Sequence, residues 1–407
     1  MTTKKDTGRS NTKQGTSKGI LRLGEQTEYR IARLFVWMGY FVRRGREIYT
    51  AGYLDQATDL DVLALRYRAL FSKEVITIES KTGGQGPLDR VFWLAGVRKY
   101  VDADRALLFR APTKWNIRDF AKQAGVEIFD PNRLSALESR YVGEPTLWLG
   151  LCDWDFLRAR ADSWNKILAT HSKYKELFQT LVTEVRYEEP FAIIAFWIHH
   201  LRGLVRDCAR EKNSAQELVR YLISDAVGQL AVAFLRVAQS TVDLTAHDRK
   251  GLVAKKLVFG EQEPRLVERI FDNAYQIAKA AIRDKLGTDV EIDRSLFSVP
   301  KPDYVEEIVD LVEDLVGDGE QATDLPQVVD IMMSEWFLKG NRERRVLRRV
   351  FPNEGLAQRT AVAQRFLRRL LRLGAVPPMV EELLVIRTGK DDNIDPKQES
   401  ERGSLLT

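Results

Sequence analysis

Apolar residues recur at two different spacings along the chain, and the change between them falls near residue 135. Before that point, short apolar and β-branched runs, typical of buried strands, alternate with segments whose apolar positions repeat at helical spacing. The order of elements that these patterns predict is helix, three strands, helix, strand, helix and strand. The expected ranges are a helix over 25–38, a strand beginning at Phe41, strands over 60–65 and 75–81, a helix over 88–101, a strand over 105–109, a helix over 116–124 and a strand over 126–129.

Strands that are separated by helices favour an α/β arrangement with some parallel pairing. We therefore expect residues 21–135 to form an α/β domain in which helices flank a central mixed sheet. After this part the strand signals fade, and a mostly α-helical C-terminal domain is expected over 136–388, as one unit or two subdomains. Its clearest amphipathic segments are 191–210, 215–242, 263–285, 304–316 and 356–373. Residues 1–20, a basic tail, and residues 389–407 are polar and are predicted to be disordered.

Composition narrows the class of protein. The 407 residues are 44% hydrophobic and 30% charged, which is typical of globular proteins. Cys152 and Cys208 are the only cysteines, which excludes a disulfide framework and a zinc site made of cysteines alone. Inspection finds no apolar run near the roughly 18 residues of a membrane span and no signal peptide, so we expect a cytoplasmic protein without membrane contact.

Charged residues interrupt two neighbouring strands of the predicted sheet. Asp61 comes directly before the apolar run of one strand, and Glu79 and Lys81 end the next. Residues two apart in a strand share a face, so Glu79 and Lys81 project to the same side. If the two strands pair, Asp61, Glu79 and Lys81 converge at one end of the sheet. Asp59 shares the face of Asp61 and is a rival for its place, but the unbroken apolar run favours Asp61.

Two carboxylates beside an ammonium suit the hydrolysis of a phosphodiester bond. Hard oxygen ligands favour Mg²⁺ or Mn²⁺, and such a metal polarises the phosphate and lowers the pKa of a bound water. Lys81 would orient or deprotonate that water, or stabilise the charge that develops on the phosphate. The alternative interpretation is that Glu79 and Lys81 form a solvated pair on an edge strand while Asp61 caps a turn.

An Asp, an apolar strand and then Glu-x-Lys on the next strand resemble the pattern of the PD-(D/E)xK nuclease superfamily, which has the restriction-endonuclease-like fold. The likeness is closest to the Mrr-like and Holliday-junction-resolvase-like branches, which begin with a helix that carries a glutamate and ends near a Gly-Tyr pair. Here Glu28 lies in the first predicted helix, and Gly39-Tyr40 follows its end. The resemblance covers residues 21–135 only. One departure is that Leu60, in place of proline, precedes Asp61.

The resemblance implies metal ligation by Asp61 and Glu79, water activation by Lys81 and an accessory carboxylate at Glu28, for which Glu25 is a substitute. It further implies a Mg²⁺-dependent endonuclease that hydrolyses DNA in bacterial defence or DNA processing, with the helical domain used for targeting. Many relatives of the fold act as dimers, so a homodimer is one expectation. Two other functions compete: a non-catalytic nucleic-acid-binding or regulatory module on a nuclease-like scaffold, and a helical protein–protein scaffold with a vestigial N-terminal domain.

Positive charge is concentrated late in the chain. Residues 339–372 hold eleven basic and two acidic side chains, a local charge of +9, whereas the whole chain carries +5. Arginine suits phosphate contacts through its planar fork, so this stripe predicts salt-dependent binding to a nucleic-acid backbone. The alternative is a solvated face that pairs with the acidic helix expected over 304–316. The arginines of the predicted stripe are Arg345, Arg348, Arg349, Arg365, Arg368, Arg369 and Arg372.

Overall fold

The computed structural model of the chain describes most of the region in which elements are expected. The described residues are 26–49, 55–81, 86–183, 189–287, 291–341, 345–351 and 355–384. The two predicted tails, 1–20 and 389–407, and Glu25 lie outside these ranges.

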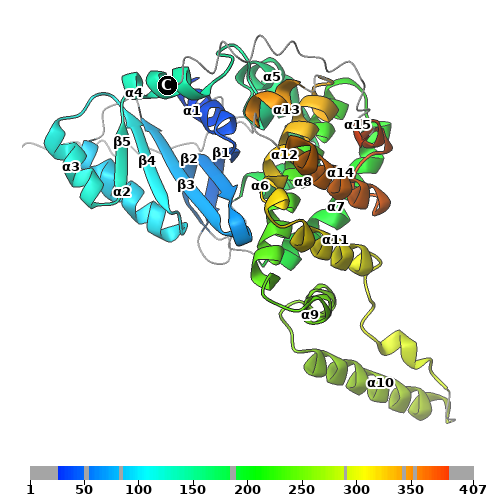
Figure 1. Ribbon diagram of the computed structural model, residues 1–407. Helices are drawn as coiled ribbons and strands as arrows, with labels where there is room; N and C mark the ends of the chain where they lie inside the picture. The colour runs from blue at the N-terminus through cyan, green and yellow to red at the C-terminus, as the bar shows by residue number, and fades with distance from the viewer. Residues whose placement is uncertain are drawn as a thin grey trace, which may run out of the picture.

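A five-stranded mixed sheet forms the N-terminal part, with its strands side by side in chain order (Figure 1). The first three strands are antiparallel, whereas the third, fourth and fifth are parallel. The alternation of strands and helices therefore predicted both the sheet and its mixed character. The strands are β1 (Phe41–Tyr49), β2 (Gln56–Tyr67), β3 (Lys73–Lys81), β4 (Arg105–Arg110) and β5 (Val126–Phe129).

Helices cover both faces of this sheet. On β4, Leu108 packs with residues of α2 (Pro87–Tyr100) and α3 (Trp115–Gln123), because strand side chains alternate between faces. Its neighbour Leu107 belongs to the core that includes α1 (Gln26–Trp37) and α4 (Pro131–Tyr141). The bounds of α1, α2 and α3 lie within one residue of those predicted from apolar spacing.

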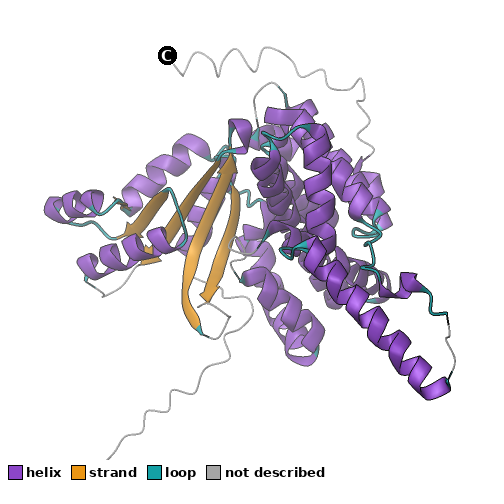
Figure 2. Cartoon of the chain, turned by 90° about the horizontal axis from the view of Figure 1, so that it is seen from below, coloured by secondary structure: helices purple, strands orange, loops and turns teal. Residues whose placement is uncertain are grey.

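The rest of the described chain is mostly helical, as predicted, and lies beside the sheet (Figure 2). Three of its helices begin at a polar side chain that caps them: Asp153, Glu189 and Thr245 accept hydrogen bonds from the backbones of Phe156, Ala192 and Asp248. The helices are α5 (Trp154–Thr170), α6 (Ser172–Val182), α7 (Pro190–Arg210), α8 (Asn213–Thr241), α9 (Ala246–Phe259), α10 (Pro264–Leu286), α11 (Val305–Asp318), α12 (Leu325–Ile331), α13 (Arg345–Val350), α14 (Leu356–Arg372) and α15 (Glu381–Leu384).

Helix α8 forms the centre of the helical part. By length and composition alone it is apolar enough to cross a membrane, which corrects the expectation that the chain holds no such run. Within the fold, however, 94% of its apolar window is buried, as in the core helix of a globular protein. The apolar character of α8 is therefore accounted for by packing against its neighbours.

Helix α10 has the opposite surroundings, because it extends away from the other helices (Figure 1) and none of its residues is buried. Its sequence is nevertheless amphipathic, and the side chains of Ile270 and Ile277 are 57% and 69% exposed. The 3.6-residue pattern predicted this helix, although the described residues leave much of its apolar side uncovered.

A buried group of charges joins the sheet to the helical part. Arg43 of β1 donates to Asp225 of α8 at 2.6 Å and to Asp330 of α12 at 2.7 Å. All three side chains are about 5–6% exposed. Gly228 allows this contact, because a Cβ there would lie 2.5 Å from a terminal nitrogen of Arg43. Edge strand β1 is thus covered by helices on its outer side.

Candidate active site

The pairing of β2 with β3 brings Asp61 next to the end of β3. The two strands pair in register up to Val62 and Ile78, one residue short of Asp61 and Glu79. The backbone N–H of Ser80 donates to Oδ2 of Asp61 at 2.7 Å. This bond holds the Asp61 carboxylate against β3, where alternation of side chains puts Glu79 and Lys81 on one face.

Lys81 lies between the two carboxylates. Its Nζ is 3.1 Å from Oε1 of Glu79 and 4.0 Å from Oδ2 of Asp61. Because both distances end at the same nitrogen, their sum of 7.1 Å is the upper limit for the separation of those two oxygens. The three residues expected to form the site are therefore brought together. The carboxyl groups of Asp61 and Glu79 also share a hydrogen bond, so they are close enough to hold one ion between them.

The two carboxyl groups share a buried environment that disfavours a second negative charge. Burial, with the charge of Asp61 next in importance, raises the pKa of Glu79 to about 7. Burial also raises the pKa of Asp61, although the bond from Ser80 and a hydrogen bond with Glu79 oppose the rise. The pair therefore holds a proton more tightly than ordinary carboxyls, as expected where a cation would otherwise balance the charge.

Lys81 stays positively charged in this setting. Burial alone would lower its pKa, but the charges of Asp61 and Glu79 outweigh that effect and raise the pKa above its ordinary value. The side chain is 36% exposed, so its ammonium reaches solvent. A protonated, partly exposed ammonium can donate a hydrogen bond to a water or to a phosphate oxygen.

Glu28 of α1 lies near this group but has a partner of its own. A guanidinium nitrogen of Arg44, on β1, donates to its carboxylate, and the guanidinium of Arg44 covers the ring of Tyr29. Burial, followed by the charge of Asp61, raises the pKa of Glu28. Its carboxylate is thus close enough to Asp61 to influence it, while Arg44 balances part of its charge.

The structure adds Arg90, which sequence patterns did not single out. It lies in the first turns of α2, and its terminal nitrogen is 3.5 Å from Oε1 of Glu79. Arg110, at the end of β4, is the register partner of Lys81, so a further cation borders the same edge. In the sequence, the one feature that could have pointed to Arg90 as a site residue is its place after the loop that follows Lys81. That feature is weak evidence.

Two alternatives from the sequence can now be weighed. β3 is an inner strand, paired on both sides, and the Glu79 side chain is only 3% exposed. The interpretation of Glu79 and Lys81 as a solvated pair on an edge strand is therefore wrong. Asp59 shares the face of Asp61 but is two residues further than Asp61 from Val62, where the pairing of β2 with β3 ends. The geometry favours Asp61 over Asp59 as the partner of Glu79.

The residues present suit a hard divalent ion held by few protein ligands. No cluster of three or more His, Cys, Asp or Glu side chains with metal-binding geometry occurs within the described part of the chain. Mg²⁺ is commonly held by one or two carboxylates together with waters and phosphate oxygens. Asp61 and Glu79 meet that requirement, whereas Cys152 and Cys208 are buried, on η2 (Gly150–Cys152) and α7.

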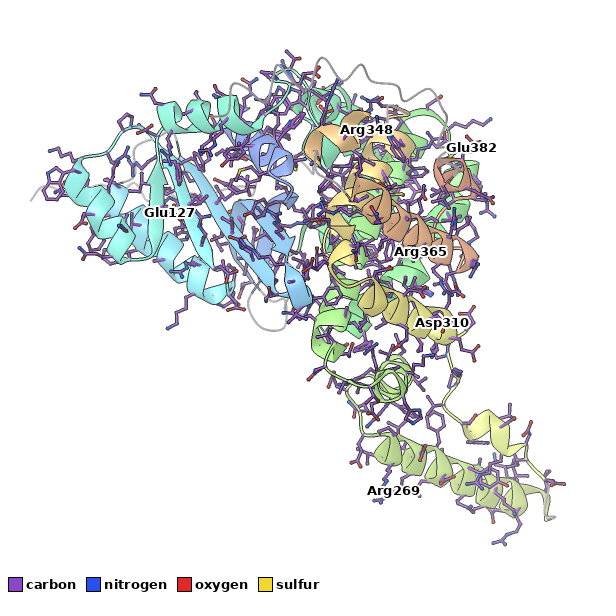
Figure 3. All side chains as sticks on the ribbon, in the orientation of Figure 1. Glu127, Arg269, Asp310, Arg348, Arg365 and Glu382 are labelled. Carbon is purple, nitrogen blue, oxygen red and sulfur yellow. The ribbon has the colours of Figure 1, made fainter. Side chains whose placement is uncertain are left out.

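The arginines of the predicted stripe are largely engaged by acidic side chains. Arg369 lies 3.0 Å from Glu307 and 2.9 Å from Asp314, and Arg365 pairs with Asp318. These acids belong to α11, which packs beside α14; Figure 3 labels Arg365 and Asp310 on the two helices. Arg372 also pairs with Glu307 of α11. Arg349 pairs instead with Glu144. The pairing expected under the alternative interpretation is therefore present.

Other members of the stripe have more exposed side chains. Arg348 and Arg368 are exposed on α13 and α14, and Arg372 is 66% exposed despite its ion pair. The side chain of Arg345 lies outside the described part of the structure. Binding of nucleic acid by the exposed arginines stays a prediction.

Comparison with family models, with curated proteins and with solved structures gave no match.

Proposed function

We propose that the chain is a metal-dependent nuclease that hydrolyses phosphodiester bonds of DNA, with its site at Asp61, Glu79 and Lys81. One observation carries the proposal: Lys81 contacts a carboxylate from each of two neighbouring strands, that of Glu79 within 3.1 Å and that of Asp61 within 4.0 Å, and these side chains are only 3% and 12% exposed. The order of helix, three antiparallel strands, helix and parallel strand also agrees with the restriction-endonuclease-like fold that the sequence resembles. DNA processing or defence is what that resemblance implies.

The roles follow from the charges of the side chains. Asp61 and Glu79 would hold Mg²⁺ or Mn²⁺, which when bound polarises the phosphate and acidifies a water. Lys81, which remains protonated, donates a hydrogen bond to the attacking water or to a phosphate oxygen and stabilises the added negative charge. This argues against Lys81 as the base. Arg90 balances the charge of Glu79 from α2.

A non-catalytic nucleic-acid-binding protein is the second candidate. It is favoured by the partners that already balance part of the negative charge, since Arg44 engages Glu28 and Arg90 engages Glu79. Such a protein would bind nucleic acid without cleaving it. The two candidates therefore differ in a single measurable property.

The deciding experiment compares cleavage of plasmid, linear and branched DNA and of RNA in Mg²⁺, in Mn²⁺ and in EDTA. We expect cleavage with the metals and none in EDTA. Lys81→Ala should lower the cleavage rate by about 100-fold or more while DNA binding persists, because a donor to the transition state is removed. Lys73→Ala is the matched control, since Lys73 begins the same strand and is 38% exposed beside Asp102.

Two outcomes would contradict the proposal. Wild-type protein that binds DNA but cleaves no substrate with either metal would favour the second candidate. A Lys81→Ala variant that cleaves as fast as the Lys73→Ala control would remove Lys81 from the reaction.

A further inference from the structure

A cleft lies directly beside the candidate site, between the sheet and the helices that cover its β1 edge. Its volume is about 570 Å³. One wall is formed by Glu28 of α1, by β1 and by Asp59 and Asp61 of β2, and the other by helices α5, α6 and α8. The polar or small side chains on the helical wall include Asn165, Ala169, Lys175 and Gln179.

Asp61 connects the cleft to the proposed chemistry. It belongs to the site with Glu79 and Lys81, and it also lines the cleft. Across the strand pair, Gly45 of β1 lies opposite Asp61, because the residues on either side of it pair with Val62 and Leu60. A Cβ on Gly45 would meet no atom within 4 Å, so open space adjoins this position. A phosphate bound at Asp61 would therefore have its attached nucleoside next to the cleft.

The size of the cleft limits what it can receive. A cube of the same volume has an edge of about 8 Å, whereas the major groove alone of a B-form duplex is about 12 Å wide. Clefts of roughly 300–1,000 Å³ hold ligands of small-molecule size, a class that includes one nucleotide. The cleft is thus too small for a duplex and suits one unpaired unit of a strand.

The charges that line the cleft lead to the same conclusion. Its arginines are already paired within the protein, as Arg43 is with Asp225 and Asp330 and Arg44 is with Glu28. Lys175 is exposed. A surface that follows a duplex backbone needs many phosphate contacts from cations, whereas amide groups such as that of Gln179 suit the edges of an unpaired base.

We propose that this cleft receives an unpaired nucleotide adjoining the scissile phosphate, so that the protein acts on single-stranded or locally unpaired nucleic acid. The inference rests on the proposed function for the position of the phosphate. A paired nucleotide would first have to leave its stack and its pairing partner, which makes duplex a poorer substrate.

The test combines binding and cleavage. Ala169 is exposed on α5, and Ala169→Trp would fill the cleft without changing a charge. Ala159→Trp is the matched control, because Ala159 is exposed on the same helix and does not line the cleft. Binding of a fluorescent single-stranded oligonucleotide, as DNA and as RNA, is measured by anisotropy in EDTA. Its cleavage with Mg²⁺ and with Mn²⁺ is compared with that of the matching duplex.

We expect wild-type protein and Ala159→Trp to prefer the single strand. Ala169→Trp should bind it about tenfold more weakly, because the indole would occupy space proposed for the nucleotide. The DNA and RNA arms identify which polymer is preferred. Lys175→Glu provides a second variant at an exposed position, with Lys166→Glu on α5 as its control, and should weaken binding without altering the fold.

Each other result is informative. Duplex cleaved as fast as single strand, or cleft variants that bind like their controls, would overturn the inference while leaving the proposed function intact. In another outcome, the protein binds the single strand, Ala169→Trp weakens this binding, and neither metal supports cleavage. That result would overturn the proposed function while the assignment of the cleft stands. Absence of both binding and cleavage would overturn both.

Discussion

Glu79 is the site residue whose negative charge is most strongly opposed by its buried position. Its side chain is 3% exposed, and Lys81 and Arg90 both contact the same carboxylate oxygen. These two cations do not fully offset burial and the charge of Asp61, because the pKa of Glu79 is raised to about 7. An uncompensated carboxylate in this position destabilises the folded chain and favours the binding of a cation.

The pH dependence of stability should reveal the destabilising effect of ionised Glu79. Between about pH 4.5 and pH 7 the folded chain keeps a proton on Glu79 that the unfolded chain has lost, so the free energy of unfolding falls as pH rises. At about 1.4 kcal/mol per pKa unit, the loss approaches roughly 3 kcal/mol above pH 7. Glu79→Gln cannot titrate and should show a smaller fall, which comes from Asp61 and Glu28, whose pKa values are also raised. The measurement is denaturant unfolding in EDTA at about pH 5 and about pH 8.

Glu127→Gln supplies the control for that comparison. Glu127 lies on β5 of the same sheet, and its side chain is 45% exposed beside Arg105. This variant should lose stability between the two pH values as the wild type does. If Glu79→Gln also follows the wild type, the proton is not held at Glu79.

The residue scale also shows what a sequence can and cannot indicate about a site. The two-residue spacing of Glu79 and Lys81 predicted a shared face. The apolar run after Asp61 predicted that Asp61 lies at the end of a strand, which is wrong, because β2 begins at Gln56 and Asp61 lies inside it, where the pairing with β3 ends. Arg44 and Arg90 were not predicted, because they reach the carboxylates from another strand and from a helix. Their contribution depends on tertiary packing, for which local spacing carries no signal.

At the scale of elements, helix α14 shows how one pattern can support two functions. Its apolar periodicity predicted the bounds of the helix closely, since 356–373 was expected and Leu356–Arg372 is observed. The same periodicity placed arginines along one side. It could not indicate whether those arginines face solvent, because the acids of α11 that receive them depend on how the two helices pack.

The two roles of the stripe separate at neighbouring positions of α14. Arg369 is 20% exposed and bonded to Glu307 and Asp314, so Arg369→Ala should lower the free energy of unfolding by about 1–2 kcal/mol. Arg368 is exposed, and Arg368→Ala should change the free energy of unfolding by less than about 0.5 kcal/mol. Denaturant unfolding of both variants is the measurement. Equal losses would mean that the ion pairs with α11 contribute nothing.

DNA retention on the same two variants addresses the binding role. An exposed arginine that contacts phosphate contributes to the salt dependence of affinity, so Arg368→Ala should flatten the salt slope if the stripe binds DNA. An unchanged slope would assign the stripe to the packing of α14 against α11.

For the whole molecule, the main question is what joins the sheet to the helices, since the proposed cleft lies between them. Arg43 bonds with Asp225 and Asp330, which follow it by 182 and 287 residues in the chain. No periodic pattern relates residues so far apart, so the sequence predicted each part but not their contact. The position of the cleft therefore depends on a group of charges that only the folded chain assembles.

Removing Arg43 should weaken that contact strongly. Arg43→Met leaves the carboxylates of Asp225 and Asp330, both about 5–6% exposed, without their main partner. Breaking a buried pair in this way costs about 3–5 kcal/mol, because desolvated charge is left uncompensated. Arg105→Met breaks the exposed pair with Glu127 and should cost less than about 1 kcal/mol. Denaturant unfolding measures both.

Further substitutions show whether uncompensated carboxylate charge causes the loss of stability in Arg43→Met. Adding Asp225→Asn and Asp330→Asn to Arg43→Met removes the two uncompensated carboxylates, so part of the lost stability should return. If the triple variant is no more stable than Arg43→Met, the loss comes from packing of the arginine side chain against its neighbours, such as the ring of Phe41 that it covers at 4.0 Å. In that case the contact between sheet and helices would be held by shape more than by charge, and single-stranded binding in the cleft should survive neutralisation of Asp225.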